Sequence, residues 1–580
     1  MSTPKWKTLL NDKVRTVYPQ PDRNKEKDAK LEDFLKQTIV ALNAMKHEPD
    51  QEKWFWGDIS KRKMISKPNS PAKEILTGIK NDIALPQEIG DRDTVMNDLL
   101  SRFNGVPHWG HTKTLINVVP QSSELSVAAA MLGAMVNANL VESELSSDIA
   151  AAEVEVIAML AEMFGWNKVK AGGICTTGGT NNYLYATKIA LTQCLGYSSR
   201  HNGIRQDVKV LASKGSHYAK YNTADWTGLG RKNVVEIDVN PDGTMNVDHL
   251  EEVLRSLYKQ GIPVAMVVAT AGTTDAFAID NIREIAHLCK MIPKEYFTDQ
   301  RPFVYADAVI GWAWMAFRDY DFTNNPLEFS TRALKLISDS ILKASGMEDV
   351  DAVGVDFHKT GFAAYASSAF CLKDERMFDL LKNPGGGVSY LFHSVKDIYY
   401  PGKFTLEVSR ACGPALIAWT HLKYFGYEGY QVMIGHLIEM QQALRDELEF
   451  HQNIVVVNKD SYGAVTLFRV YPKWMDGGLQ YQNEFFKEKY DDELMKYNQF
   501  QQDVYNTLCE MHEQEGIPAP ALSITTKFRT TEYGKPVCAL KAYLMGAHTN
   551  TDPQYLKKEV VAHIQKAVEI VSAKQKVNSN

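Results

Sequence analysis

The chain has few cysteines, and none of them lies in a pattern that marks a structural site. Seven cysteines are spread over 580 residues, an odd number without any CxxC pair. A disulfide framework and a cysteine zinc site are therefore not expected, and the pattern favours a reducing cytoplasm. Long apolar runs are also missing, because residues 1–20 contain no apolar segment typical of a secretory signal. The longest apolar stretch, Pro263–Ala269, is far shorter than the ~20 residues of a membrane span.

An excess of positive charge is missing as well. Lys and Arg number 64 against 70 for Asp and Glu, which gives a net charge of −6. This balance provides no broad cationic surface for nucleic acid or anionic lipid. The hydrophobic share of 44% and the charged share of 23% are ordinary for a globular protein. We therefore expect a soluble cytoplasmic protein of about two to four domains, with no nucleic-acid or membrane partner.

Short apolar runs alternate with helix-like segments through the middle of the chain, which predicts βαβ units and a largely parallel sheet covered on both faces. The runs are Val208–Ala212, Val234–Val239, Val264–Ala269, Phe303–Tyr305, Ala352–Val355 and Ser368–Leu372. The segments Asn181–Leu195, Val247–Lys259 and Ile279–Cys289 are predicted helices, as is Ser147–Phe164 upstream. The fold class is therefore α/β.

The pattern changes near residue 430. Long polar helices are predicted at Tyr430–Glu449 and Asn483–Glu515, the second with a solvated face, around strands at Ile454–Val457 and Ala464–Tyr471. This is the composition of an α+β domain. We expect an N-terminal helical or extended segment at 1–115, a large domain at 116–428 and a small C-terminal domain at 429–580.

Polar side chains follow the predicted strands at the point where each strand ends. His217 follows the first run, Thr270 and its neighbours follow the run ending at Ala269, and Asp307 follows Phe303–Tyr305. The segment Asp356-Phe-His-Lys359 follows Ala352–Val355. Ligands of open parallel sheets bind outside the carboxyl ends of the strands, so we expect these residues to meet at one site.

A glycine turn lies ahead of these strand ends. Cys175-Thr-Thr-Gly-Gly-Thr180 opens the helix predicted at Asn181–Leu195, and free N–H groups at a helix N-terminus suit a phosphate. The spacing matches neither a Walker A loop nor a dinucleotide fingerprint. A lysine beside such a cofactor suggests a Schiff base. Lys359, Thr180 and Asp307 could together meet the three needs of pyridoxal 5'-phosphate (PLP): an amine, a phosphate site and an anion for the ring nitrogen.

Six segments in register resemble the group II PLP-dependent amino-acid decarboxylases, which include the aromatic-amino-acid, tyrosine and glutamate enzymes. The segments are Thr176-Thr-Gly-Gly-Thr-Asn181, Ser216-His-Tyr218, Ala269-Thr-Ala-Gly-Thr-Thr274, Ala306-Asp-Ala308, His358-Lys359 and Thr405-Leu-Glu-Val-Ser-Arg410. Each is weak alone, but the order and spacing are similar over roughly residues 100–425. The resemblance implies the fold type I of PLP enzymes, with a mostly parallel seven-stranded sheet between helices, and a homodimer whose active site lies at the interface.

The resemblance also implies a role for each matched residue. Lys359 binds the cofactor aldehyde, Asp307 pairs with the pyridinium nitrogen, and His217 stacks on the ring. A further set is implied in cofactor binding, some of it around the phosphate: Gly179, Thr180, Thr270, His358 and Ser409.

Two further residues are implied near the substrate. Tyr390 matches a loop tyrosine that guides protonation of the product, which favours decarboxylation over aldehyde formation. His111, in His108-Trp-Gly-His111, resembles a segment near the substrate entrance, although plain structure is the commoner use of such a histidine. No third metal ligand sits at suitable spacing, so no metal site is expected. Phe357 and Thr360 replace residues usual in the family and leave the substrate open.

The favoured function is decarboxylation of an L-amino acid to its amine and CO₂, with an aromatic amino acid such as tyrosine as substrate. Acidic and diamino acids stay open as substrates. An aldehyde synthase or carbon–carbon lyase of the same family is the alternative chemistry, and a catalytically inactive PLP-fold scaffold is the alternative without catalysis. Lys359, Asp307 and His217 all argue against the scaffold.

Overall fold

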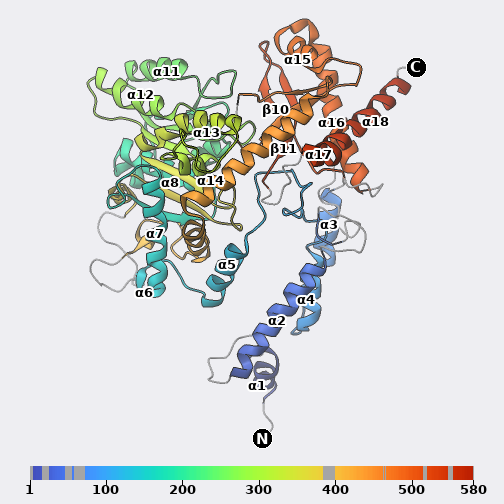
Figure 1. The fold of residues 1–580 in the computed structure, drawn as a ribbon. Coiled ribbons are helices and arrows are strands. Elements are labelled where there is room, and N and C mark those ends of the chain that lie inside the picture. Colours follow the sequence, from blue (N-terminus) through green and yellow to red (C-terminus); the bar gives the residue numbers. More distant parts are fainter. Residues whose placement is uncertain are drawn as a thin grey trace. The chain divides into compact units, whose positions relative to one another are not determined.

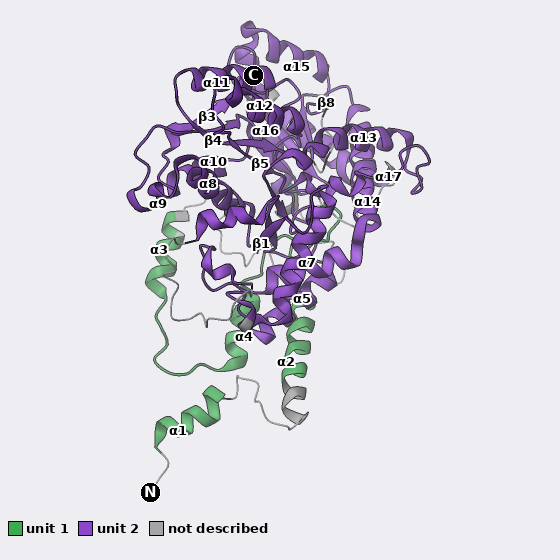
Figure 2. Ribbon diagram, turned by 90° about the vertical axis from the view of Figure 1, so that its left-hand side faces the viewer, with its two compact units in different colours: residues 1–114, 510–518 green, residues 115–509, 519–580 purple. Residues whose placement is uncertain are grey.

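The computed structural model describes residues 4–15, 25–45, 55–57, 72–382, 399–460, 463, 465–513, 519–545 and 553–578. The chain forms two compact units, residues 1–114 with 510–518 and residues 115–509 with 519–580 (Figure 2). The helices of the first unit are α1 (Lys5–Leu9), α2 (Lys25–Ala44), α3 (Ala72–Asp82) and α4 (Arg92–Ser101). Within the described residues, none of the helices is long and apolar enough to cross a membrane.

A seven-stranded sheet is the centre of the second unit (Figure 1). Its strands are β1 (Gly172–Thr176), β2 (Lys209–Ser213), β3 (Val234–Ile237), β4 (Val264–Thr270), β5 (Phe303–Asp307), β6 (Ala352–Asp356) and β7 (Ser368–Leu372). They lie in the order β1-β7-β6-β5-β4-β2-β3. Strands β3, β2, β4, β5 and β6 pair in parallel, whereas β7 runs antiparallel to both β6 and β1. The expected mostly parallel sheet is confirmed.

Helices cover both faces of this sheet because its strands are apolar on both sides. Every residue of β4 is buried, and its apolar side chains are divided between two clusters: Val267 belongs to one, with Ile282 of α12, and Val268 to the other, with Ile189 of α8. The helices of this region are α5 (Glu124–Val136), α6 (Ser143–Ser146), α7 (Asp148–Met163), α8 (Gly179–Leu195), α9 (Ser198–Asn202), α10 (Ala219–Trp226), α11 (Val247–Lys259), α12 (Ile282–Glu295) and α13 (Thr331–Ala344).

A smaller antiparallel sheet follows in the same unit, in the order β10-β11-β9-β8. Its strands are β8 (Ile454–Val456), β9 (Val465–Val470), β10 (Ser523–Thr530) and β11 (Pro536–Tyr543). The long helix α14 (Gly413–Glu449) leads into it and leaves helical geometry at Gly426, where φ is +54°. The other helices here are α15 (Gly477–Phe486), α16 (Asp491–Glu513), α17 (Pro553–Tyr555) and α18 (Ala562–Asn578).

The structure corrects one predicted helix. Asn483–Glu515 is not continuous, because Lys487 takes an extended conformation between α15 and α16. Nor is it merely a solvated face, since Glu484, Leu494 and Phe500 are fully buried. Strands β1, β10 and β11 were not predicted. The three-part division at 115 and 428 stays a prediction, with both sheets lying in one compact unit here.

Candidate active site at the strand ends of the large sheet

The carboxyl ends of β4, β5 and β6 bring the predicted polar residues side by side. Thr270 is the register partner of Asp307, and Asp307 is the partner of Gly354 in β6. Asp307 is 3% exposed, and its Oδ1 has no hydrogen-bond partner in the described structure. The hydroxyl of Thr270 is likewise buried without a partner, while its backbone N–H donates to Asp280 at 2.7 Å. Two unpaired buried polar atoms at neighbouring strand ends leave hydrogen-bonding capacity that a ligand could use.

Lys359 extends its amine toward a second buried acid. Its Nζ lies 2.9 Å from Oδ2 of Asp356, which is the last residue of β6 and is 1% exposed. The hydroxyl of Ser368 donates to the other carboxylate oxygen at 2.6 Å, and His358 Nε2 lies 3.5 Å from Oδ2. The sequence analysis assigns no role to Asp356. Its position at the end of an apolar strand, three residues before the lysine, is the feature from which a role at the site could be predicted.

The charges at the sheet edge are strongly coupled. Burial alone favours the neutral amine of Lys359, but the negative charges of Asp356 and Asp307 outweigh it and raise the lysine pKa. Burial raises the pKa of Asp307 to about 7, although the charge of Lys359 opposes the change. The site therefore holds Lys359 as a cation between two acids, one paired and one with an unpaired oxygen.

His217 lies within the electrostatic reach of the same lysine. Burial and the positive charge of Lys359 lower the His217 pKa to about 4, so the ring is neutral at pH 7. The backbone N–H of Ala219 donates to Nδ1 at 3.2 Å, which places the ring hydrogen on Nε2. A neutral imidazole that is partly exposed can stack on an aromatic cofactor.

The glycine turn begins α8, as the sequence predicted. A Cβ on Gly179 would lie 2.8 Å from Val309 Cγ1 and 3.3 Å from Asp356 Oδ2, so the backbone passes close to the acid that holds Lys359. Thr180 is exposed as the second residue of the helix. The first N–H groups of a long helix and its dipole suit the phosphate of a cofactor.

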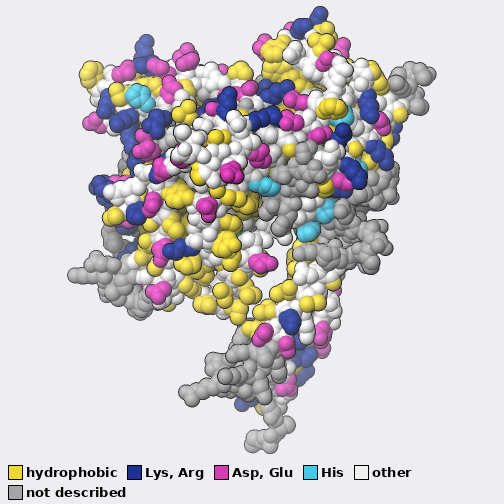
Figure 3. Space-filling model, in the orientation of Figure 1, with side chains coloured by type: hydrophobic (Ala, Val, Ile, Leu, Met, Phe, Trp, Pro, Cys, Tyr) yellow, Lys and Arg dark blue, Asp and Glu magenta, His cyan; other side chains and the backbone are white. Residues whose placement is uncertain are grey.

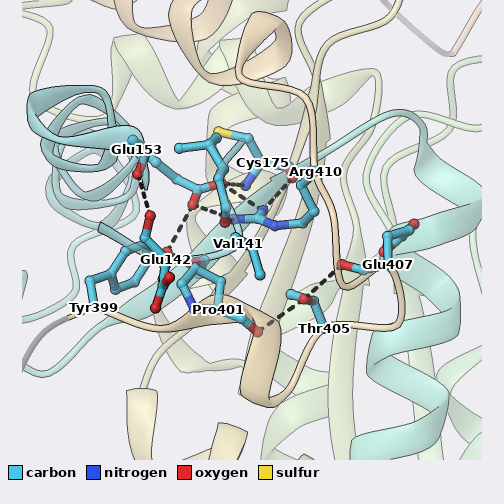
Figure 4. Close-up of polar contacts among 12 residues, drawn as sticks. Val141, Glu142, Glu153, Cys175, Tyr399, Pro401, Thr405, Glu407 and Arg410 are labelled. Atoms are coloured by element: carbon cyan, nitrogen blue, oxygen red, sulfur yellow. Dashed lines mark hydrogen bonds and ion pairs between the residues drawn. The ribbon is translucent and has the colours of Figure 1, made fainter. Parts of the chain in front are cut away.

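A buried ion pair fixes the strand that leads into this turn (Figure 4). Arg410 binds Glu153 of α7 through two hydrogen bonds of 2.8 and 2.7 Å. The Glu153 carboxylate also accepts from the Tyr399 hydroxyl at 2.9 Å and from the N–H of Cys175, the residue before Thr176, at 2.8 Å. Glu407, on the same segment as Arg410, accepts from Asn181 and Tyr185 of α8. These contacts anchor both ends of the glycine turn.

The structure brings several of the predicted residues together at the sheet edge. Lys359, Asp307, His217 and His358 share the sheet edge, with the ring of His358 stacked on Tyr365. The hydroxyl of Ser409 instead accepts from Asn139 at 3.2 Å. His111 belongs to the first compact unit, where its Nδ1 accepts from the N–H of Lys113. Tyr390 lies outside the described residues. In those residues no cluster of three or more His, Cys, Asp or Glu could hold a metal ion.

Comparison with known proteins identifies the family of the chain. The model of the pyridoxal-dependent decarboxylase conserved domain matches residues 77–301 and 335–470, more than half of the chain. The chain belongs to the pyridoxal-dependent decarboxylase family. Both matched ranges carry site residues: Gly179, His217 and Thr270 lie in the first, and Asp356 and Lys359 in the second. Asp307 lies between the two ranges.

Curated decarboxylases that are named for different amino acids are similar to this chain. An L-2,4-diaminobutyrate decarboxylase of Acinetobacter baumannii is 27% identical over 55% of this chain and 60% of its own length. An L-tyrosine decarboxylase of Enterococcus faecalis is 27% identical over 51% of this chain and 48% of its own length. The chain thus matches only about half of the length of these curated relatives.

Solved structures share the fold over nearly the whole chain. The glutamate decarboxylase domain of a diaminobutyrate-pyruvate transaminase and L-2,4-diaminobutyrate decarboxylase from Vibrio parahaemolyticus aligns with a TM-score of 0.68 at 18% identity, covering 97% of this chain and 99% of that one. Tryptophan decarboxylase of Catharanthus roseus aligns with a TM-score of 0.66 at 13% identity, covering 96% and 99%. The expected fold type is confirmed.

The residues at the sheet edge fit the cofactor for which the family is named. PLP needs an amine for its aldehyde, an anion for its ring nitrogen and a site for its phosphate. The buried Lys359 would provide the amine, and the unpaired Oδ1 of Asp307 would provide the anion. Gly179 keeps open a backbone position that a Cβ would fill. The cofactor expected from the sequence is therefore confirmed by the family.

Proposed function

We propose that this protein decarboxylates an L-amino acid to the corresponding amine. The amino acid and one proton become the amine and CO₂, because the Cα–carboxylate bond breaks and a proton replaces the carboxylate. The single observation that carries the proposal is the geometry of Lys359, whose amine is paired with one buried acid and coupled to a second acid with an unpaired oxygen. A buried carboxylate oxygen without a partner beside a lysine amine leaves room for a further hydrogen-bond donor such as a protonated ring nitrogen.

Each residue has a defined task in this proposal. Bound PLP supplies the electron sink that makes loss of CO₂ possible. Lys359 would hold the cofactor aldehyde through its amine. Asp307 would hold a proton on the ring nitrogen, and the neutral ring of His217 would stack on the cofactor ring. Gly179, Thr180 and His358 hold the phosphate, and Thr270 lies beside Asp307. Roles for Ser409, His111 and Tyr390 rest on the sequence resemblance alone.

For the substrate, we propose an aromatic amino acid such as tyrosine. The similarity to an L-tyrosine decarboxylase supports this choice. Similar proteins are also named for L-2,4-diaminobutyrate and for acidic amino acids, so both classes belong in the same assay. Phe357 and Thr360, which flank the His-Lys pair, are both buried.

We further propose that the protein works in the cytoplasm as a homodimer. Helix α5 supports the dimer, because apolar side chains project from it into solvent (Figure 3). The side chains, which are 39% to 65% exposed, are Val127, Met131, Leu132, Met135 and Val136. Exposed apolar patches on soluble proteins commonly mark interfaces. Leu132→Arg should give a monomer by light scattering after gel filtration, whereas the matched change Val169→Arg, at another exposed apolar residue, should leave a dimer.

The catalytic proposal is tested by trapping and by product analysis. The protein is loaded with PLP and reduced with borohydride, and peptide mapping should find the cofactor on Lys359. Lys359→Ala should carry no label and form no amine. A panel of the twenty amino acids with L-2,4-diaminobutyrate is then scored for amine, CO₂ and aldehyde. Label on another lysine, or turnover by Lys359→Ala, contradicts the proposal. Aldehyde and ammonia in place of amine would instead identify an aldehyde synthase.

A further inference from the structure

The turn that follows Lys359 has a conformation that its own residues do not favour. Phe362 has φ = +56°, in the left-handed region, which costs a non-glycine residue about 1–2 kcal/mol. Gly361 packs against the preceding backbone so closely that a Cβ would lie 2.5 Å from both Cα and O of Phe357. A turn of this kind keeps its shape only when its surroundings impose it.

Three hydrogen bonds from other parts of the unit impose that shape. The hydroxyl of Thr360 donates to Ile310 O at 2.5 Å, and the N–H of Ala364 donates to the Ser126 hydroxyl of α5 at 3.1 Å. Between these two contacts, Nδ1 of His421 in α14 lies 2.8 Å from the carbonyl oxygen of Gly361, two residues after the lysine. The bond from His421 is the central support of the turn.

The ring of His421 is fully buried, and its partners fix its protonation. The Gly361 carbonyl can only accept, so Nδ1 carries the hydrogen. Nε2 lies 2.6 Å from the Ser123 hydroxyl, which donates to it in the neutral ring. Ser123 also caps α5 by accepting from the N–H of Ser126 at 3.0 Å. Burial lowers the His421 pKa, which agrees with a neutral ring that is held at both nitrogens.

We propose that His421, oriented by Ser123, is a positioning residue for Lys359: it holds the Gly361 carbonyl and thereby the turn that aims the lysine amine. The proposal rests on the assignment of Lys359 as the cofactor-binding lysine. His421 lies on a different helix from every residue assigned to the cofactor, and its hydrogen bond to the turn is to the backbone carbonyl of Gly361. Its loss should therefore change the presentation of the amine while the other cofactor contacts remain.

The experiment compares His421→Phe with His421→Gln. Phenylalanine keeps the bulk and removes both hydrogen bonds, whereas glutamine can donate to Gly361 and accept from Ser123. Two readouts do not depend on turnover: PLP affinity from the absorbance of the bound cofactor, and the rate at which formaldehyde and cyanoborohydride methylate Lys359 in the cofactor-free protein. We expect His421→Phe to weaken PLP binding by about tenfold and to change the methylation rate of Lys359 alone among the lysines. His421→Gln should recover most of both.

Thr420→Val is the matched control, because within the described residues the Thr420 hydroxyl bonds to Leu416 O of its own helix. It should change neither readout. If His421→Phe does not fold, Ser123→Ala replaces it, because that change removes the hydrogen bond to His421 Nε2 and leaves the histidine in place. Ser123→Ala should reproduce the change in the methylation rate of Lys359. A cooperative unfolding transition shows that this variant is folded. Wild-type PLP affinity and methylation in the folded variant overturn the proposal. If borohydride reduction labels a different lysine in the wild type, the proposed function fails together with this proposal. If Lys359 is labelled, its methylation rate in the variant tests the role of His421 separately from the proposed function.

Discussion

Two buried charge clusters in the second unit differ in how completely the protein satisfies them. In the small sheet, Arg469 and Glu484 are both fully buried and joined at 2.8 Å. Arg469 also donates to Tyr471, Asn498 and the carbonyl of Cys538, and Glu484 accepts further bonds from Tyr471 and Gln480. At the edge of the large sheet, two acids share one lysine, and Asp307 keeps an unpaired oxygen.

The difference separates a structural cluster from a chemical one. A buried pair of one cation and one anion with every hydrogen bond made is a closed arrangement, and removing one partner leaves an uncompensated charge. A cluster with two acids and one lysine is called open here, because a cationic ring nitrogen can still pair with its second acid. We therefore expect changes in the Arg469 cluster to lower stability and changes in the Lys359 cluster to lower function.

The largest effect is expected in the closed cluster. Glu484→Ala should lower the free energy of unfolding by about 3–5 kcal/mol, because Arg469 remains buried without its counter-charge. Urea unfolding measures the loss. The exposed neighbour Glu488 is the control, since Glu488→Ala should stay within about 0.5 kcal/mol of wild type. A loss of PLP affinity in the folded protein would show that the two clusters are not independent.

In the open cluster, Asp307→Asn should act on catalysis. We expect kcat to fall about 10²–10³-fold, the scale for loss of a preorganised electrostatic partner. Stability should respond in the opposite direction: the folded pKa of about 7 lies above the ordinary value of Asp, so the cofactor-free wild type loses stability as pH rises toward and through 7. The cofactor-free variant should lack this loss. Steady-state kinetics and urea unfolding from pH 5 to 8 test both parts, and a variant that is less stable at pH 8 contradicts the open cluster.

Substitution of Asp356, the second acid of the open cluster, should change the proton affinity of Lys359 rather than the stability of the protein. Asp356→Asn keeps the shape of the side chain but removes the charge that raises the Lys359 pKa. The lysine pKa should fall, so the cofactor-free variant should methylate faster at Lys359 than wild type at a fixed pH. A pH series with peptide mass spectrometry measures the change. Asp379→Asn, at an exposed acid paired with Lys382, should leave the rate unchanged.

The sequence predicted the sheet where side-chain pattern alone determines a strand. Strands β4, β5 and β6 are apolar runs buried on both faces, and each ends at a polar residue. Strand β1 was missed because it opens with Gly172-Gly173, and β10 because most of its side chains are polar and only partly buried. Both form strands through pairing with β7 and β11, respectively, which a local pattern does not contain.

The site shows the same limit. Lys359, Asp307 and His217 could be found because the residues after buried strands meet at one edge of a parallel sheet. The role of Asp356 depends on Ser368 of the antiparallel strand β7, which orients its carboxylate. Glu153 and Arg410 are 257 residues apart, and the local sequence around each does not predict that they form an ion pair. Contacts of this kind follow from tertiary packing.

The smallest effect is expected at that third buried pair, which lies near the cofactor edge. Both carboxylate oxygens of Glu153 accept hydrogen bonds, whereas Arg410 Nε has no partner in the described structure. Tyr399→Phe removes the hydroxyl that bonds to Glu153 at 2.9 Å and, more weakly, to Gly173 O at 3.4 Å. The Glu153 carboxylate keeps Arg410 and the N–H of Cys175. The cost should be about 1 kcal/mol of unfolding free energy, the usual value for one hydrogen bond. PLP affinity should not change if the pair only anchors β1. The control is Tyr197→Phe, because the Tyr197 hydroxyl makes its hydrogen bond to Asp379 O, far from the glycine turn. A larger drop in PLP affinity in Tyr399→Phe than in this control would mean that Glu153 influences the phosphate site.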